Sequence, residues 1–255
     1  MSKIDLNIVW DDAREMARAN RDLLTAIGGI FILMPLLVAI QLVSVPEGMP
    51  DPKTSEEAFA TWYRAFVSVN LPIFLVWTLV ASFGTLAMLV LLLRQERPTV
   101  ADSLKAALFI LPSYCVAYIL QNVALQVGMI LFVLPALYLT GRFALIAAVA
   151  AAETERNPIT IVQRSFALTR GNGWRIFALM AIIVIAMSIV FIAGILFTGV
   201  VTALFLPPDL AELLMNLVVG VMMTALLLAL VLVSAALYRA ATAPVAAPWR
   251  PDASF

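Results

Sequence analysis

Six long apolar stretches dominate this sequence of 255 residues. They lie at about residues 24–44, 70–93, 107–127, 129–152, 175–204 and 211–239. About 20 consecutive apolar residues cross the hydrocarbon core of a bilayer as an α-helix. In lipid, a helix satisfies every backbone polar group within its own segment. The sequence therefore predicts an all-α integral membrane protein, with six transmembrane helices forming one domain over residues 1–239.

The composition supports this class and excludes several others. Only 13% of the residues are charged, about half the fraction of a soluble domain, and the zero net charge gives no reason to expect nucleic-acid binding. The chain has no histidine and one cysteine, Cys115, which removes histidine-based catalysis, histidine metal sites and cysteine-rich zinc sites. Gly171 and Gly173 are too close together for a phosphate-binding loop. We predict no catalytic residue, no metal and no cofactor.

Basic residues predict the orientation. With six spans, both termini share one side with the 94–106 and 153–175 connections, and fourteen of the sixteen basic residues fall there. Only Lys53 and Arg64 fall on the other side. The positive-inside rule places the fourteen in the cytoplasm. We therefore predict an inner-membrane protein with both termini cytoplasmic, and residues 240–255, rich in alanine and proline, as a disordered cytoplasmic tail.

Short amphipathic segments precede each pair of spans on the cytoplasmic side. These segments lie at residues 7–22, with Asn7 as N-cap, 99–106 and 158–170. They predict interfacial helices. Because one such helix precedes each pair of spans, they also predict three repeated helix-plus-hairpin units. The alternative is that the similarity between these leucine-rich segments arises by chance. On the other side, residues 55–66 predict one further helix lying on the outer interface.

The third cytoplasmic helix has start and stop signals that agree. Asn157 suits the N-cap and Pro158 suits the first helical position. Arg170 complements the negative C-terminal end, and Gly171 can take the left-handed conformation that ends a helix. Ser165 is expected to bond to a backbone carbonyl rather than to react, as is Thr169.

Two residues of the fourth span stand out. Pro135 removes a helical hydrogen bond and predicts a bend in the span. Arg142 lies well inside the span, where a charge is costly and often marks function. It either extends to the cytoplasmic headgroups or pairs with an acid such as Glu153, or it contacts a lipid phosphate or a ligand.

Two interpretations are open for three further basic residues, Arg164, Arg170 and Arg175. They lie within or just beyond the third cytoplasmic helix, where basic side chains can bind anionic lipid headgroups. The alternative is general anchoring on the positive side of the membrane.

A signature in the second half of the chain suggests a family. It consists of Pro135-Ala-Leu-Tyr138, Arg142-Phe143, Glu153, Asn157-Pro158, Ser165-Phe166, Leu168-Thr169-Arg170-Gly171 and Trp174-Arg175. This text resembles the membrane domain of glycerophosphoryl diester phosphodiesterase and related uncharacterised six-span inner-membrane proteins, over about residues 129–180. The resemblance implies a membrane module. The catalytic barrel that some members carry uses histidines, which this sequence lacks.

Together these observations predict a non-catalytic multi-pass membrane protein that interacts with membrane lipids or acts as a scaffold for a protein partner at the inner membrane. The alternative is a small transporter or export component with Arg142 on the substrate path. A membrane enzyme is the least favoured class, because histidine and paired carboxylates inside the spans are absent.

Overall fold

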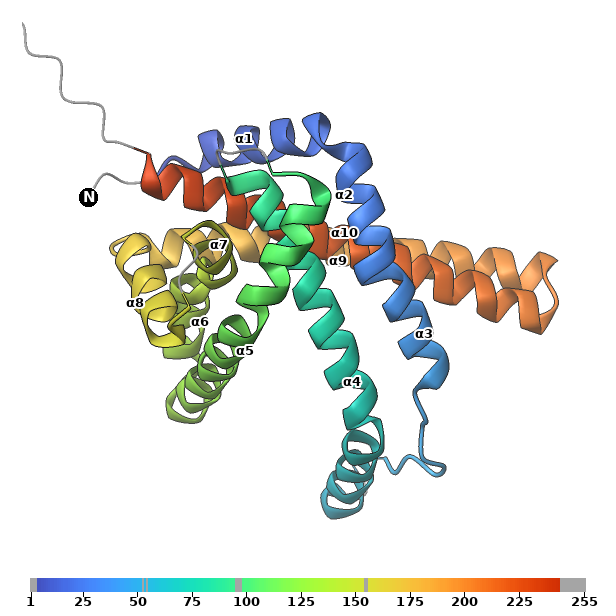
Figure 1. The fold of residues 1–255 in the computed structure, drawn as a ribbon. Helices are drawn as coiled ribbons and strands as arrows, with labels where there is room; N and C mark the ends of the chain where they lie inside the picture. The colour runs from blue at the N-terminus through green and yellow to red at the C-terminus, as the bar shows by residue number, and fades with distance from the viewer. Residues whose placement is uncertain (1–3, 52, 54, 95–97, 154–155, 244–255) are drawn as a thin grey trace, which may run out of the picture.

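A computed structural model describes residues 4–51, 53, 55–94, 98–153 and 156–243 of the chain. The regular secondary structure of these residues is all helical, and the model has six helices long and apolar enough to cross a membrane (Figure 1). The elements in order are α1 (Leu6–Ala19), α2 (Arg21–Gly28), the π-helical turn η1 (Gly29–Leu33), α3 (Met34–Leu42), α4 (Glu56–Leu93), α5 (Val100–Leu131), α6 (Val133–Phe143), α7 (Ile146–Ala152), α8 (Pro158–Leu168), α9 (Gly173–Phe205) and α10 (Pro208–Thr242). The predicted fold class is confirmed.

The spans form three hairpins that meet at one end and diverge at the other. The first hairpin pairs α2, η1 and α3 with α4, the second pairs α5 with α6 and α7, and the third pairs α9 with α10. Figure 1 shows α4 and the α9–α10 hairpin leaving the centre in very different directions. The buried core lies where the hairpins meet, and its largest contributions come from Leu86–Val90, Leu145–Ala151 and Val231–Leu237.

Helix α1 lies across this shared end. It packs along α10 and buries Val9, Ala13 and Met16, which share one face of the helix. Its N-cap is Asp5, whose carboxylate accepts a hydrogen bond from the backbone N–H of Asn7 at 2.9 Å. The prediction of Asn7 as N-cap was therefore wrong by two positions.

Two of the predicted surface helices are not separate elements. Residues 55–66 form the first turns of α4, and 99–106 form the first turns of α5. Neither segment is followed at once by a glycine or proline that could end it, and helix formation is cooperative, so each continues into its span. The three hairpins are present, but a separate surface helix precedes only the first and the third.

The divergent end of the first hairpin is held by one amide. The Asn70 side chain accepts a hydrogen bond from the Ser44 N–H and donates to the Ser44 carbonyl, both at 2.8 Å. It also donates to the Phe66 carbonyl at 2.8 Å and is fully buried. The Trp62 indole donates to the Pro46 carbonyl at 2.9 Å. These bonds fix the loop between α3 and α4 against the first turns of α4.

Pro135 does not bend a span; it lies at the junction between two helices. A proline at this position would clash with the carbonyl of Leu131 if α5 continued through it. The chain instead becomes extended at Phe132, with φ of −172°, and α6 begins at Val133 with Pro135 in its first turn. The interruption of the fourth span falls later, at Ala144 and Leu145, between α6 and α7.

The third hairpin is the longest. Helices α9 and α10 have 33 and 35 residues, about 50 Å each, which exceeds the hydrocarbon core and requires tilt or projection beyond it. The Met222 side chain of α10 packs against Gly194 of α9, where a Cβ would lie 2.8 Å from Met222 Sδ. Helix α10 continues to Thr242, so the predicted tail began three residues too early, and residues 244–255 lie outside the described part.

Contacts between connections gather cationic segments at the shared end. Arg94 Nε donates to the Ala151 carbonyl at 3.2 Å, and Arg239 pairs with Asp12 at 3.1 Å. These contacts, together with α8, bring the first and last described residues and the described parts of both connections predicted to be cytoplasmic to one end of the molecule, as the prediction requires. The side of the membrane on which this end lies stays a prediction.

Candidate functional site

The interruption between α6 and α7 leaves backbone carbonyl oxygens without a helical N–H partner. Three side-chain hydroxyl groups donate hydrogen bonds to two of these oxygens. Ser165 Oγ donates to the carbonyl oxygen of Arg142 at 2.8 Å, and Thr169 Oγ1 donates to the same oxygen at 3.3 Å. Ser234 Oγ donates to the carbonyl of Ala144 at 3.1 Å. Side chains inserted into a helical hydrogen-bond ladder are a common cause of such breaks. The prediction that Ser165 and Thr169 bond to backbone carbonyls is confirmed.

Beside this break, α6 crosses the start of α9 at backbone contact distance. A Cβ on Gly141 would collide with the carbonyl oxygen of Gly173 and would lie 3.1 Å from the backbone nitrogen of Phe177. Only glycine allows two helices to approach this closely. We call this place, with Gly141, Arg142 and Gly173, the α6–α9 crossing.

Arg142 is buried at the α6–α9 crossing, with 8% of the residue exposed. Its guanidinium carbon lies 4.8 Å from the centre of the Phe166 ring and 5.8 Å from that of Tyr138, which is cation–π geometry. Its Nη1 atom is buried without a hydrogen-bond partner, and no carboxylate of the described residues forms an ion pair with it. The side chain neither extends to the surface nor pairs with Glu153, so both parts of that interpretation were wrong.

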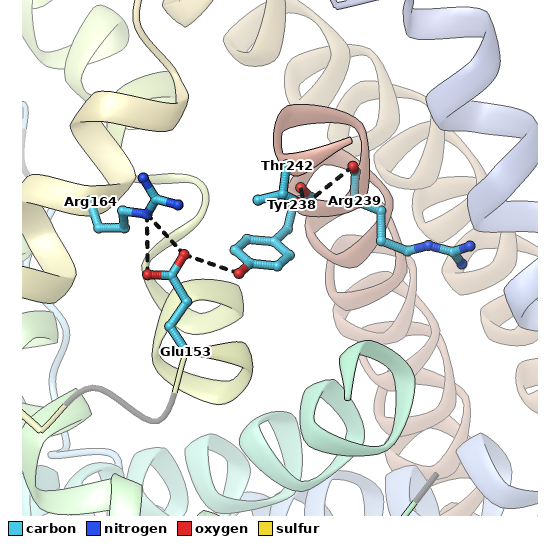
Figure 2. Close-up of polar contacts among 5 residues, drawn as sticks. All are labelled: Glu153, Arg164, Tyr238, Arg239 and Thr242. Carbon is cyan, nitrogen blue, oxygen red and sulfur yellow. Dashed lines mark hydrogen bonds and ion pairs between the residues drawn. The ribbon is translucent and has the colours of Figure 1, made fainter. Parts of the chain in front are cut away.

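Glu153 has other partners. Arg164 Nε on α8 donates to both carboxylate oxygens of Glu153, at 2.9 and 3.1 Å, and the Tyr238 hydroxyl on α10 donates to Oε1 at 3.0 Å (Figure 2). Figure 2 also shows Arg239 directed away from this group, toward the side where it pairs with Asp12. We call Glu153, Arg164 and Tyr238 the Glu153 cluster; it ties the end of α7 to α8 and α10.

The limits of α8 agree with the sequence. The Asn157 side chain accepts a hydrogen bond from the Ile159 N–H at 3.0 Å, and Pro158 is the first helical residue. Gly171 has φ of +79° in the turn after the helix. Arg170 and Arg175, on either side of this turn, are both exposed.

The N-terminus of α9 is a feature that the sequence did not indicate. Asn172 occupies the N-cap position, but its side chain makes no capping bond, because its Oδ1 accepts from the Ile4 N–H at 3.3 Å instead. The N–H groups of Gly173, Trp174 and Arg175 have no hydrogen-bond acceptor among the described residues. Two of these residues, Trp174 and Arg175, are exposed.

A large cavity lies elsewhere, between α1, α4 and α10. Its volume is about 1330 Å³, and its charged lining includes Asp12, Glu15, Arg94 and Arg239. Arg239 is paired with Asp12, and Arg94 donates through Nε to a carbonyl, although its Nη2 has no partner. Because acids and bases are mixed in this lining, the cavity selects no particular charge.

Neither a cluster of metal-ligating side chains nor a similarity to known proteins identifies the function of the site. In the part of the chain that the structure describes, no three histidine, cysteine or carboxylate side chains lie together as metal ligands would. Comparison of the chain with protein-family models, with curated proteins and with solved structures found no match. The resemblance of residues 129–180 to the phosphodiesterase membrane domain therefore stays a prediction.

Proposed function

We propose that this chain is a non-catalytic protein of the inner membrane, with cytoplasmic termini, that binds anionic lipid through one face at its cationic end. This face, the α8–α9 face, consists of Arg164, Arg170, Trp174 and Arg175. The observation that carries the proposal is the exposure of Arg170, Trp174 and Arg175 around the turn that joins a short non-spanning helix to a long apolar one.

The chemistry of the α8–α9 face suits a membrane surface. Helix α8 has 11 residues, too few to cross a bilayer, and it buries Ile161, Ser165 and Leu168 on its inner side. Tryptophan is enriched at the headgroup level because its ring is apolar and its N–H is polar. Each basic residue near an anionic surface contributes about 1 kcal/mol of attraction. Arg164 contributes less to such attraction, because Glu153 neutralises it.

Retention of lipid by the purified protein tests the proposal. The variant R170A/R175A removes two exposed charges, and we expect it to retain fewer phosphatidylglycerol molecules than the native chain in native mass spectrometry. The matched control is R14A/R18A, which removes two exposed charges from α1. Loss confined to R170A/R175A supports the proposal. An equal loss in both variants would mean general attraction at the cationic end, and unchanged retention in R170A/R175A would contradict binding at this face.

One observation favours the alternative, a transporter. Transporters place substrates at interrupted membrane helices, where unwound carbonyls are free to coordinate them. The fourth span is interrupted at Ala144 and Leu145, next to Arg142. However, the carbonyls of Arg142 and Ala144 already accept hydroxyl hydrogen bonds, which makes these two oxygens poorer ligands for a substrate or ion. Solute flux in proteoliposomes that Arg142→Ala abolishes would favour transport.

A further inference from the structure

We propose that the first turn of α9 and the guanidinium of Arg142 together form a site for one phosphate group. The proposal deepens the proposed function by naming the chemical group and its place, and it rests on that function only for the membrane as the source of the phosphate. It combines two features that are independent in the chain: an uncapped helix N-terminus and a buried cation that forms no ion pair with a carboxylate of the described residues.

The helix contributes unused donors and a dipole. The N–H groups of Gly173, Trp174 and Arg175 point out of the first turn of a helix of 33 residues, with no acceptor among the described residues. Such groups, together with the positive end of the helix dipole, bind phosphate in many proteins. The residue placed to cap them, Asn172, is held by the Ile4 N–H, so its side chain leaves this turn open.

The aliphatic stem of Arg142 lies beside the same turn, and its guanidinium lies over the rings of Phe166 and Tyr138. A Cβ on Gly173 would lie 3.0 Å from Arg142 Cδ and 2.7 Å from Tyr138 Cε2, so the arginine stem passes directly beside the first residue of α9. The residue is 8% exposed and its Nη1 is unpartnered. A buried guanidinium without an anion is unfavourable, and its planar donors match two oxygens of a phosphate.

The surroundings favour a phosphate ester. The nearest described acid in the sequence that follows, Glu153, is bonded to Arg164 and Tyr238, and no carboxylate of the described residues pairs with Arg142. Arg170 and Arg175 are exposed on either side of the turn and add positive charge. Aromatic rings supply an apolar wall: Trp174 lies 5.8 Å from Tyr138 and 6.0 Å from Phe177, centre to centre. A phosphate joined to an apolar group matches this combination, and it can come from a lipid headgroup or from a soluble phosphate ester.

Thermal unfolding of the whole protein in a neutral detergent tests the site. We expect phosphatidic acid in mixed micelles to raise the unfolding midpoint, whereas phosphatidylcholine does not. In parallel, glycerol 3-phosphate is compared with sodium chloride at equal ionic strength. A rise with phosphatidic acid alone identifies a lipid phosphate, and a rise with both compounds shows that a free phosphate ester is sufficient. No rise with either compound would overturn the proposal.

Variants assign the response to Arg142. We expect Arg142→Met to lose the phosphate-dependent rise. Arg142→Lys, which keeps the charge but not the planar pair of donors, should weaken the apparent affinity at least about tenfold, as for the loss of one charge-assisted hydrogen bond. The control Arg14→Met removes an exposed arginine of α1, which belongs neither to the crossing nor to the α8–α9 face, and should keep the full rise. Equal responses from the native chain and both Arg142 variants would contradict the site, and if Arg142→Met does not fold, Arg142→Lys decides.

The outcome is independent of the broader proposal. If R170A/R175A retains phosphatidylglycerol normally while Arg142→Lys weakens the phosphate response, lipid binding by the exposed face fails and the phosphate site stands. If R170A/R175A loses lipid while both Arg142 variants respond like the native chain, the phosphate site fails and the exposed face stands.

Discussion

Arg142 of the α6–α9 crossing precedes helix α7 in the sequence, and Glu153 of the Glu153 cluster follows it. The arginine in each region has a different environment. Arg164 is about half exposed, at 45% of its side chain, and is bonded to both oxygens of a carboxylate. Arg142 is buried between aromatic rings and meets no carboxylate of the described residues. In the Glu153 cluster the positive and negative charges pair with each other, whereas the charge of Arg142 at the crossing has no carboxylate partner in the part of the chain that the structure describes.

This difference separates structural polar groups from candidate binding groups. A carboxylate with two donors, such as Glu153, ties helices together and needs nothing further. A buried cation persists only where the surrounding packing holds it in place, and at the crossing that packing is backbone against backbone through Gly141. Three variants, taken from the largest expected effect to the smallest, test whether the two regions differ in this way.

The largest effect is expected at the crossing itself, from Gly141→Leu. A side chain there must displace the backbone of α9 at Gly173, which cannot move as the end of a flexible side chain could. Overpacking of this kind costs about 1–3 kcal/mol and more where backbone must shift. We expect aggregation in size-exclusion chromatography or a strongly lowered unfolding midpoint in detergent. Gly199→Ala is the matched control, because a Cβ there meets only Met215 Cε, at 3.8 Å; equal behaviour of the two variants would mean that the close approach is unimportant.

An intermediate effect is expected from S165A/T169V, which removes both hydroxyls that donate to the Arg142 carbonyl. A buried carbonyl left without a donor costs about 1–3 kcal/mol. We expect a lowered midpoint and, because Arg142 is no longer held on its backbone side, a weaker response to phosphatidic acid. Thr25→Ala serves as control, since that exposed hydroxyl donates only to the Arg21 carbonyl within its own helix. A midpoint equal to that of the control would show that the hydroxyls do not stabilise the break.

The sequence was sufficient to predict those features of the structure that depend on residues close to one another in the chain. The six spans follow from apolar length, and the limits of α8 follow from Asn157, Pro158 and Gly171, each of which acts on the backbone within a few positions. The position of Pro135 was recognised, but whether a proline bends a helix or starts one depends on where the preceding helix ends.

The crossing could not be predicted in the same way. Ile4 and Asn172, whose bond leaves α9 uncapped, are 168 positions apart, and no local pattern pairs them. Glu153 and Arg142 are close in sequence, and the expected pair failed because Arg164 and Tyr238 reach the carboxylate from other helices. The sequence therefore identified Arg142 as unusual without indicating that none of the carboxylates described in the structure pairs with it.

The smallest effect is expected from Glu153→Gln, which removes the acid of the cluster and keeps its size. Because Arg164 is half exposed, water already solvates much of its charge, and pairs of this kind contribute about 0–1 kcal/mol. We expect a slightly lowered midpoint whose difference from the native chain shrinks as salt is raised, since exposed pairs are screened. The response to phosphatidic acid should remain, because Arg142 does not depend on this carboxylate. A large loss of stability, or loss of the phosphate response, would show that the two regions act as one charged network and that the distinction between them is wrong.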